Sequence, residues 1–223
     1  KESTGIMKAL STTLYAKSDS WSAAAGNIRK AIEALETAES ALLEIATLAT
    51  RLEELGALYN NNDLLSTSDV AALDAETETI TAAIDSIVSG ATFNGVSMLD
   101  TAGVTFDAGV TAEGNTQTLT TEAISSVAST TEASNADTTG LALSNEVTLN
   151  LGEIAGGITS LAARENIAYA ASAIMSSAAS SATDVDIASE TAMITKQMML
   201  QKISSSLVAQ ANLSENAKLN SLS

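Results

Sequence analysis

"IRKAIEALETAESALLEIATLATRLEELGALY", residues 28–59, carries the strongest periodic pattern in the chain. Its apolar residues follow one another at steps of three or four, which average close to the spacing of about 3.5 that is typical of a coiled-coil seam. No glycine lies between Asn27 and Leu55, so we expect a helix longer than ~40 Å at about 1.5 Å per residue. The seam consists of Ile28, Ile32, Leu35, Ala38, Leu42, Ile45, Leu48, Leu52, Leu55 and Tyr59.

A second helix is predicted after a polar turn. "YNNND", residues 59–63, is turn-forming sequence, and Ser68 is a suitable N-cap for the second helix. Two long helices joined by a short turn are expected to lie antiparallel. The second seam consists of Val70, Leu73, Thr77, Ile80, Ile84 and Ile87.

The middle of the chain, from about residue 90 to 140, changes character. Glycines recur and β-branched residues increase in number. Residues 104–110 and 116–121 flank a short glycine-containing loop, which predicts a β-hairpin. A lone hairpin is marginally stable in water, so we expect it to pack on the helices. Residues 122–140 are low-complexity polar sequence.

A third helical seam opens with Leu151, Ile154, Ile158 and Leu161. It then becomes rich in alanine and serine over residues 162–182, where small side chains would let helices approach closely. Asp184 and Asp186 are expected to mark the start of a final helix, because carboxylates are favoured at the positive end of the helix dipole.

The predicted fold is therefore mainly α, with long antiparallel or coiled-coil helices and a small β-hairpin region. We expect a helical rod domain over residues 1–183. It would contain two amino-side helices, the β region at about 90–140 and a returning carboxy-side helix. Residues 184–223 would form a separate carboxy-terminal helix.

The last predicted helix is apolar on nearly every side. Placed on a helical wheel, its large apolar side chains sweep roughly 260°, whereas a helix against one core needs a stripe only a little over 100° wide. Such a helix is buried either within its own monomer or by other chains. The residues of this arc are Met193, Ile194, Met198, Met199, Leu200, Ile203, Leu207 and Val208.

Composition argues against catalysis and against two classes of partner. The 223 residues include no histidine and no cysteine, so the commonest general base, thiolate nucleophile and metal ligands are missing. We therefore expect no catalytic, cofactor-binding or metal-binding residues. A net charge of −17 repels nucleic acid and anionic membranes. The acidity is best interpreted as a solvated surface, with calcium or a cationic partner as the alternative.

Several segments resemble bacterial flagellins, in the family's order and over most of the chain. "DVDIASETAMITKQMMLQ" (184–201), "LVAQAN" (207–212) and the final "LNSLS" are similar to the family's carboxy-terminal signature. "TFNGVSMLD" (92–100) resembles the element with which the family leaves its second helix. "ALLEIATLATRLEELGAL" (41–58) is similar to the stretch before it.

The resemblance implies a structural subunit that self-assembles into the extracellular flagellar filament for motility. The carboxy-terminal helix would line an inner tube. Other implied partners are the flagellar export apparatus, an export chaperone, and the filament cap and junction proteins. The alternatives are a hook–filament junction protein and a surface flagellin homologue that acts as an adhesive module. The residues expected to mediate self-assembly are Met193, Ile194, Met198, Leu200, Ile203, Leu207, Val208, Gln210 and Asn212.

The resemblance carries two further expectations. Some flagellins are recognised by an innate immune receptor, and the motif's arginine, leucine and glutamate fall on Arg51, Leu55 and Glu76. Glu53 replaces a usual basic residue there, so weak signalling is expected. Lys1 corresponds to a point inside the family's amino-side region. We therefore expect the amino-terminal inner helix to be missing from these residues. Without that partner, the chain as given would stay monomeric or its last helix would fray.

Overall fold

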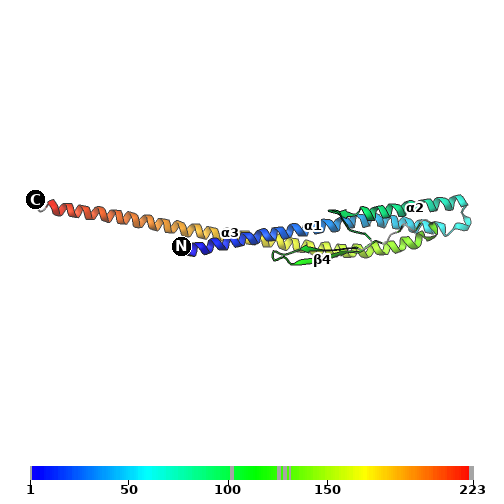
Figure 1. Cartoon of the computed structure of the whole chain (residues 1–223), viewed down its shortest axis with the longest axis horizontal. Coiled ribbons are helices and arrows are strands. Elements are labelled where there is room, and N and C mark those ends of the chain that lie inside the picture. The colour runs from blue at the N-terminus through cyan, green and yellow to red at the C-terminus, as the bar shows by residue number, and fades with distance from the viewer. Residues whose placement is uncertain (1, 101–102, 125–126, 128–129, 131, 221–223) are drawn as a thin grey trace. The chain divides into compact units, whose positions relative to one another are not determined.

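The computed structural model describes the chain except residues 1, 101–102, 125–126, 128–129, 131 and 221–223, and its side chains are described from 5 to 211. The chain divides into two compact units. We call residues 20–170 the hairpin unit, and residues 1–19 with 171–223 the terminal unit. Two long helices, α1 (Glu2–Tyr59) and α3 (Ala136–Asn220), each contribute to both units (Figure 1).

In the hairpin unit, α1 and α2 (Thr67–Gly90) form the predicted helical pair, with η1 (Asn62–Leu64) in the turn between them (Figure 1). Both seams face the core as predicted: Leu42, Leu52 and Leu55 of α1 and Ile84 of α2 are fully buried. The long helices and small antiparallel sheets confirm the predicted fold class.

Helix α2 begins at Thr67, so the predicted N-cap at Ser68 is wrong. Ser66 is the N-cap: its hydroxyl accepts a hydrogen bond from the Asp69 amide at 3.2 Å, and the Asp69 carboxylate accepts one from the Ser66 amide at 2.9 Å. This reciprocal arrangement is a capping box. The hydrogen bonds from the Ser66 side chain and backbone lower the pKa of Asp69.

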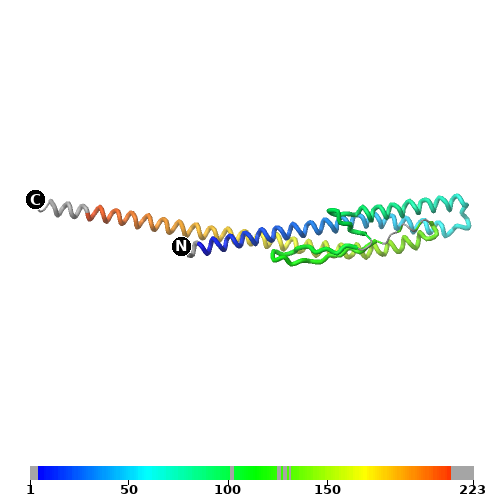
Figure 2. Tube along the Cα trace, in the orientation of Figure 1, coloured from blue at the N-terminus to red at the C-terminus, as the bar shows by residue number. Residues whose placement is uncertain are grey.

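The predicted hairpin consists of β3 (Val104–Gly109) and β4 (Thr116–Thr121), and a smaller antiparallel pair, β1 (Thr92–Phe93) and β2 (Val96–Ser97), precedes it. The hairpin packs on α3, as the backbone trace in Figure 2 shows. Leu119 is buried in the core, and the Gln117 side chain donates to the Ser160 hydroxyl at 3.1 Å. These contacts supply the support that an isolated hairpin lacks.

Helix α3 begins at Ala136, well before the predicted opening of its seam at Leu151. The glycine that made this stretch look like a loop, Gly140, lies inside the helix where α3 approaches α1 closely. A Cβ atom built on Gly140 would lie 2.6 Å from the Ala49 carbonyl oxygen and 2.8 Å from the Glu53 amide nitrogen. Glycine is therefore required there by a tertiary contact.

The segment between β4 and α3 is held by polar side chains on one side of α2. The segment's backbone amides and carbonyls would be costly to bury without partners. The bonds join Asp85 to the Val127 amide at 3.2 Å, Thr81 to the Thr130 carbonyl at 3.1 Å, and Asp74 to the Ala133 amide at 2.8 Å.

No helix starts at Asp184 or Asp186, which lie inside α3. The expected start is wrong because no glycine or proline follows Gly157, so nothing in the sequence interrupts the helix. The domain boundary between residues 183 and 184 stays a prediction.

In the terminal unit, small side chains bring α1 and α3 close together. The Ser18 hydroxyl donates to the Ser172 carbonyl at 2.9 Å, and the Ser172 hydroxyl donates to the Ser18 carbonyl at 3.0 Å. Ala179 is fully buried. The close approach predicted for the alanine- and serine-rich stretch is confirmed at these positions.

Candidate assembly surface

The candidate site is the part of α3 from Ile187 to Ala211, which we call the assembly segment. Every residue of this segment is exposed. Its large apolar side chains are 40% (Met193) to 61% (Leu207) exposed, although such residues are usually buried in a folded chain. Within the described residues, no other part of the chain covers this segment.

This result separates the two interpretations of the wide apolar arc. The described residues do not bury the arc, because its side chains are exposed on all faces. Large contiguous apolar surfaces of this kind mark interaction sites in proteins. The predicted self-assembly residues that are exposed are Met193, Ile194, Met198, Leu200, Ile203, Leu207, Val208 and Gln210, while the side chain of Asn212 lies outside the described side chains.

The assembly segment also differs in charge from the rest of the chain. Lys196 and Lys202 are its charged residues after Glu190, in a chain whose net charge is −17. The segment is therefore apolar and cationic, whereas the rest of the molecule is acidic.

Among the described residues, no helix combines the length and the apolar character that crossing a membrane requires. The two lysines and the hydroxyl and amide side chains of the assembly segment interrupt its apolar surface.

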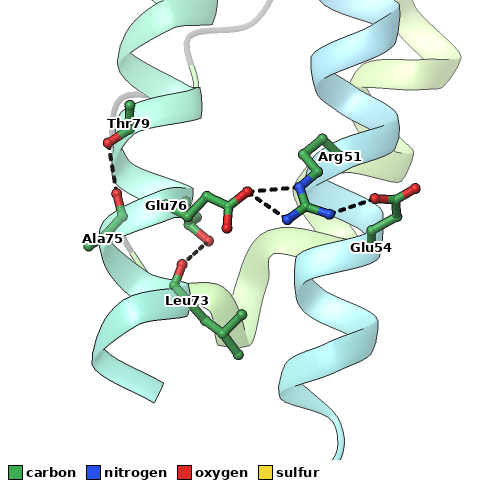
Figure 3. Close-up of polar contacts among 7 residues, drawn as sticks. Arg51, Glu54, Leu73, Ala75, Glu76 and Thr79 are labelled. Atoms are coloured by element: carbon green, nitrogen blue, oxygen red, sulfur yellow. Dashed lines mark hydrogen bonds and ion pairs between the residues drawn. The ribbon is translucent and has the colours of Figure 1, made fainter. Parts of the chain in front are cut away.

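The predicted receptor patch has two surface residues and one core residue. Figure 3 shows Arg51 of α1 between two carboxylates: its Nε donates to Glu76 Oε1 at 2.8 Å, and its Nη1 donates to Glu54 Oε2 at 2.8 Å. The hydrogen bonds to Glu54 and Glu76 raise the pKa of Arg51. Leu55 is fully buried. Arg51 and Glu76 therefore lie together on the surface, and Leu55 belongs to the seam, as its periodicity indicates.

Sequence reasoning missed a groove in the hairpin unit. It has a volume of about 490 Å³ and lies between α1, the turn of β1 and β2, and strand β3. The chain's two phenylalanines, Phe93 and Phe106, line it and are half-buried. Phenylalanine occurs only at these two positions of the sequence. Their common place at one groove follows from the fold and not from the sequence.

Comparisons with known proteins agree with the resemblance over the amino-terminal part. Residues 2–103 match the family model described as the bacterial flagellin N-terminal helical region. Among solved structures, the crystal structure of Bacillus cereus flagellin matches with 22% identity over 65% of this chain and 85% of that chain, with a TM-score of 0.47. No curated protein matches the chain. Over residues 2–103, which include α1, α2, β1 and β2, the chain is therefore similar to the amino-terminal helical region of bacterial flagellins.

Proposed function

We propose that this protein is a structural subunit of the extracellular bacterial flagellar filament, and that copies associate through the assembly segment. The observation that carries the proposal is the exposure of every residue from Ile187 to Ala211 on a helix that is apolar nearly all round. A surface this apolar gains free energy when a neighbouring chain covers it.

The free energy gained by burying the apolar side chains of the assembly segment is comparable to the cost of association. Burying the remaining half of one large aliphatic side chain contributes about 1 kcal/mol, so the eight large apolar residues contribute on the order of 8 kcal/mol per copy. Association costs several kcal/mol in lost translational and rotational freedom. A single pair of helices covers only part of a 260° arc, so the segment favours several neighbours at once, as a closed tube of helices would provide.

Net charge opposes the same association. Copies that each carry −17 repel one another, and Lys196 and Lys202 relieve this repulsion only locally. Salt shortens the range of repulsion to about 10 Å at 0.1 M. We therefore expect salt to promote polymerisation of the full-length protein, and low ionic strength to keep it dispersed.

The remaining partners are part of this proposal and rest on the family. Export apparatus, export chaperone, cap and junction proteins would be met in the course of secretion and assembly. Receptor recognition would use Arg51 and Glu76, which form a surface pair, whereas Leu55 is buried. The hook–filament junction protein is the competing interpretation within the same architecture.

The test compares aspartate substitutions inside and outside the assembly segment. Leu200→Asp and Leu207→Asp should prevent filament formation, because a buried unpaired carboxylate costs several kcal/mol. Leu149→Asp is the matched control: Leu149 is 71% exposed on the same helix but lies in the hairpin unit. Filament yield is measured by sedimentation and electron microscopy of the intact protein, and circular dichroism checks the helix content. Equal yields from all three variants would refute the proposal.

A further inference from the structure

Strand β3 has one edge that the rest of the described chain leaves unpaired. The structure contains two separate two-stranded sheets, β1 with β2 and β3 with β4. Each residue of β3, from Val104 to Gly109, is paired with β4 on one side. Within the described residues, no hydrogen bond joins the backbone of β3 to an element on its other side. An unpaired strand edge is a template on which another extended chain can form hydrogen bonds.

The groove of the hairpin unit lies beside this edge. Five of the six residues of β3 line it, including the consecutive residues Phe106, Asp107 and Ala108. Successive side chains of a strand point to opposite faces, so a groove that all three line runs along the edge of the strand and not over one face. Its volume of about 490 Å³ is within the range of about 300–1,000 Å³ that is typical of ligand sites.

The turn between β1 and β2 is a defined wall of the groove. Phe93 pairs with Val96, so the turn consists of the two residues Asn94 and Gly95. Both have positive φ, 49° and 79°. Positive φ at both central residues is the geometry of a type I′ turn, for which Asn-Gly is a preferred sequence. A wall that is already ordered loses little conformational entropy when a partner binds.

The inward side of a strand placed in the groove would meet apolar side chains. Ala108 belongs to the core, and Phe106 packs against it. Helix α1 contributes Ala31 and Ala34 to the lining, together with Lys30. Lys30 forms no ion pair with a carboxylate of the described residues, so it would repel a lysine or arginine on this side of the added strand. The inward side chains of the strand are therefore apolar.

The outward side of the same strand would meet negative charge. Thr105 and Asp107 alternate with the inward residues of β3, and both are exposed. The Thr118 hydroxyl donates to Asp107 Oδ1 at 2.6 Å, which holds the carboxylate on the outward face. A cation directly across from a carboxylate is favourable on a sheet, and a second anion is unfavourable. The net charge of −17 also attracts a basic partner from a distance.

From these observations we infer that the groove receives an extended segment of a second protein, which adds to the free edge of β3 as a further strand and alternates apolar residues with lysine or arginine. Backbone hydrogen bonds to β3 provide the affinity, and the alternation provides the specificity. A second copy of this chain does not supply such a segment, because the lysines and arginines of the described residues lie in the helices α1 and α3. The groove is separate from the assembly segment, so this inference does not depend on the proposed function.

Three synthetic peptides test the inference on the intact protein at low ionic strength, where attraction between charges is screened least. The first, Lys-Val-Lys-Val-Lys-Val, has the inferred pattern. The second has the same side chains, but all its backbone amides are N-methylated, so it cannot donate to β3. The third carries glutamate in place of every lysine. Calorimetry measures the dissociation constants, and hydrogen exchange measures the protection of the β3 amides. The first peptide should bind and slow exchange in β3, and each of the other two should bind at least about tenfold more weakly.

A charge reversal in the protein locates the site. Asp107→Lys should weaken binding of the first peptide about fivefold, because a favourable cross-strand pair becomes a repulsive one. Asp63→Lys is the matched control: it changes the net charge by the same amount, on an exposed residue of η1 outside the groove. This control should change the dissociation constant less than about twofold, since the two charges are far from the added strand.

Each contrary outcome overturns a stated part of the inference. Equal binding of the N-methylated peptide would show that attachment does not use the backbone edge of β3. Failure of the first peptide to bind, or unchanged exchange of the β3 amides when it binds, would overturn strand addition. Stronger binding of the acidic peptide would overturn the basic character of the partner. Protection of β3 that increases with the concentration of the protein alone would identify a second copy as the occupant and overturn the assignment to a different protein.

Discussion

Replacing Gly140 with alanine should destabilise the hairpin unit, whereas the same change at Gly152 in the same helix should stabilise it. The two positions differ in what a new Cβ atom would meet. At Gly140 the nearest atoms are the Ala49 carbonyl oxygen, at 2.6 Å, and the Glu53 amide nitrogen and side-chain Cγ, both at 2.8 Å. At Gly152 nothing lies within 4 Å.

The magnitudes result from two opposing terms. Alanine is favoured over glycine inside a helix by about 1 kcal/mol, and Gly152→Ala should gain most of that. Gly140→Ala gains the same amount but adds an overpacking cost of about 1–3 kcal/mol. The upper part of that range applies because two of the three obstructing atoms are backbone atoms of α1, which cannot rotate away. The Ser144–Glu53 hydrogen bond of 2.7 Å, one turn further along α3, would be strained by the same displacement.

The expected difference in the free energy of unfolding between the two variants is therefore about 2–3 kcal/mol, with Gly140→Ala the less stable. Urea unfolding followed by fluorescence measures it, because the only tryptophan, Trp21, is half-buried in the hairpin unit. The slope of the free energy against urea should not change. Stabilisation of equal size in both variants would show that α1 and α3 do not meet closely at Gly140.

Three other predictions concern single side chains. Asn150→Ala should cost about 2 kcal/mol and speed amide exchange at Glu122, because the buried Asn150 side chain bonds the Glu122 amide at 3.1 Å and its carbonyl at 2.6 Å. Ile84→Ala should cost about 2–5 kcal/mol in urea unfolding, since Ile84 is fully buried. The stabilising effect of Asp69 should be present above its unfolded pKa and lost as pH falls through its lowered folded pKa, seen as a shift of the Ser66 amide NMR signal.

The unfolding measurements and the pH measurement each have an internal control. Leu43→Ala, on an exposed side chain, should change the unfolding free energy by less than about 0.5 kcal/mol. Ser66→Ala should abolish the acid transition of the α2 cap, because the reciprocal hydrogen bonds need both residues. A pH-independent Ser66 signal in the unsubstituted protein would contradict the capping box.

The sequence pattern by itself predicted the helices and the hairpin that depend on short-range periodicity and turn residues. The seams of α1 and α2 were predictable because a side chain that recurs every three or four residues faces one side of a helix whatever surrounds it. The hairpin was predictable because its turn chemistry and alternation are contained in a short stretch. The wide apolar arc from Met193 was also predictable from the local sequence. It indicated that the assembly segment is a helix whose apolar surface favours contact with other chains.

Only the tertiary structure decided where α3 begins, because a glycine can mark a loop or can allow two helices to pack closely, and the sequence does not distinguish these cases. In the sequence, Gly140 resembles a loop residue. In the structure, it lies inside α3 where a Cβ atom would collide with α1, so the absence of a side chain allows the two helices to pack closely. The segment before α3 looked featureless because its hydrogen-bond partners, such as Asp74 and Asp85, lie on a distant helix. The groove of the hairpin unit has the same origin, since Lys30 of α1 and Phe106 of β3 line it together only after folding. Sequence alone determined which faces are apolar, and the fold determined which of them its own chain covers.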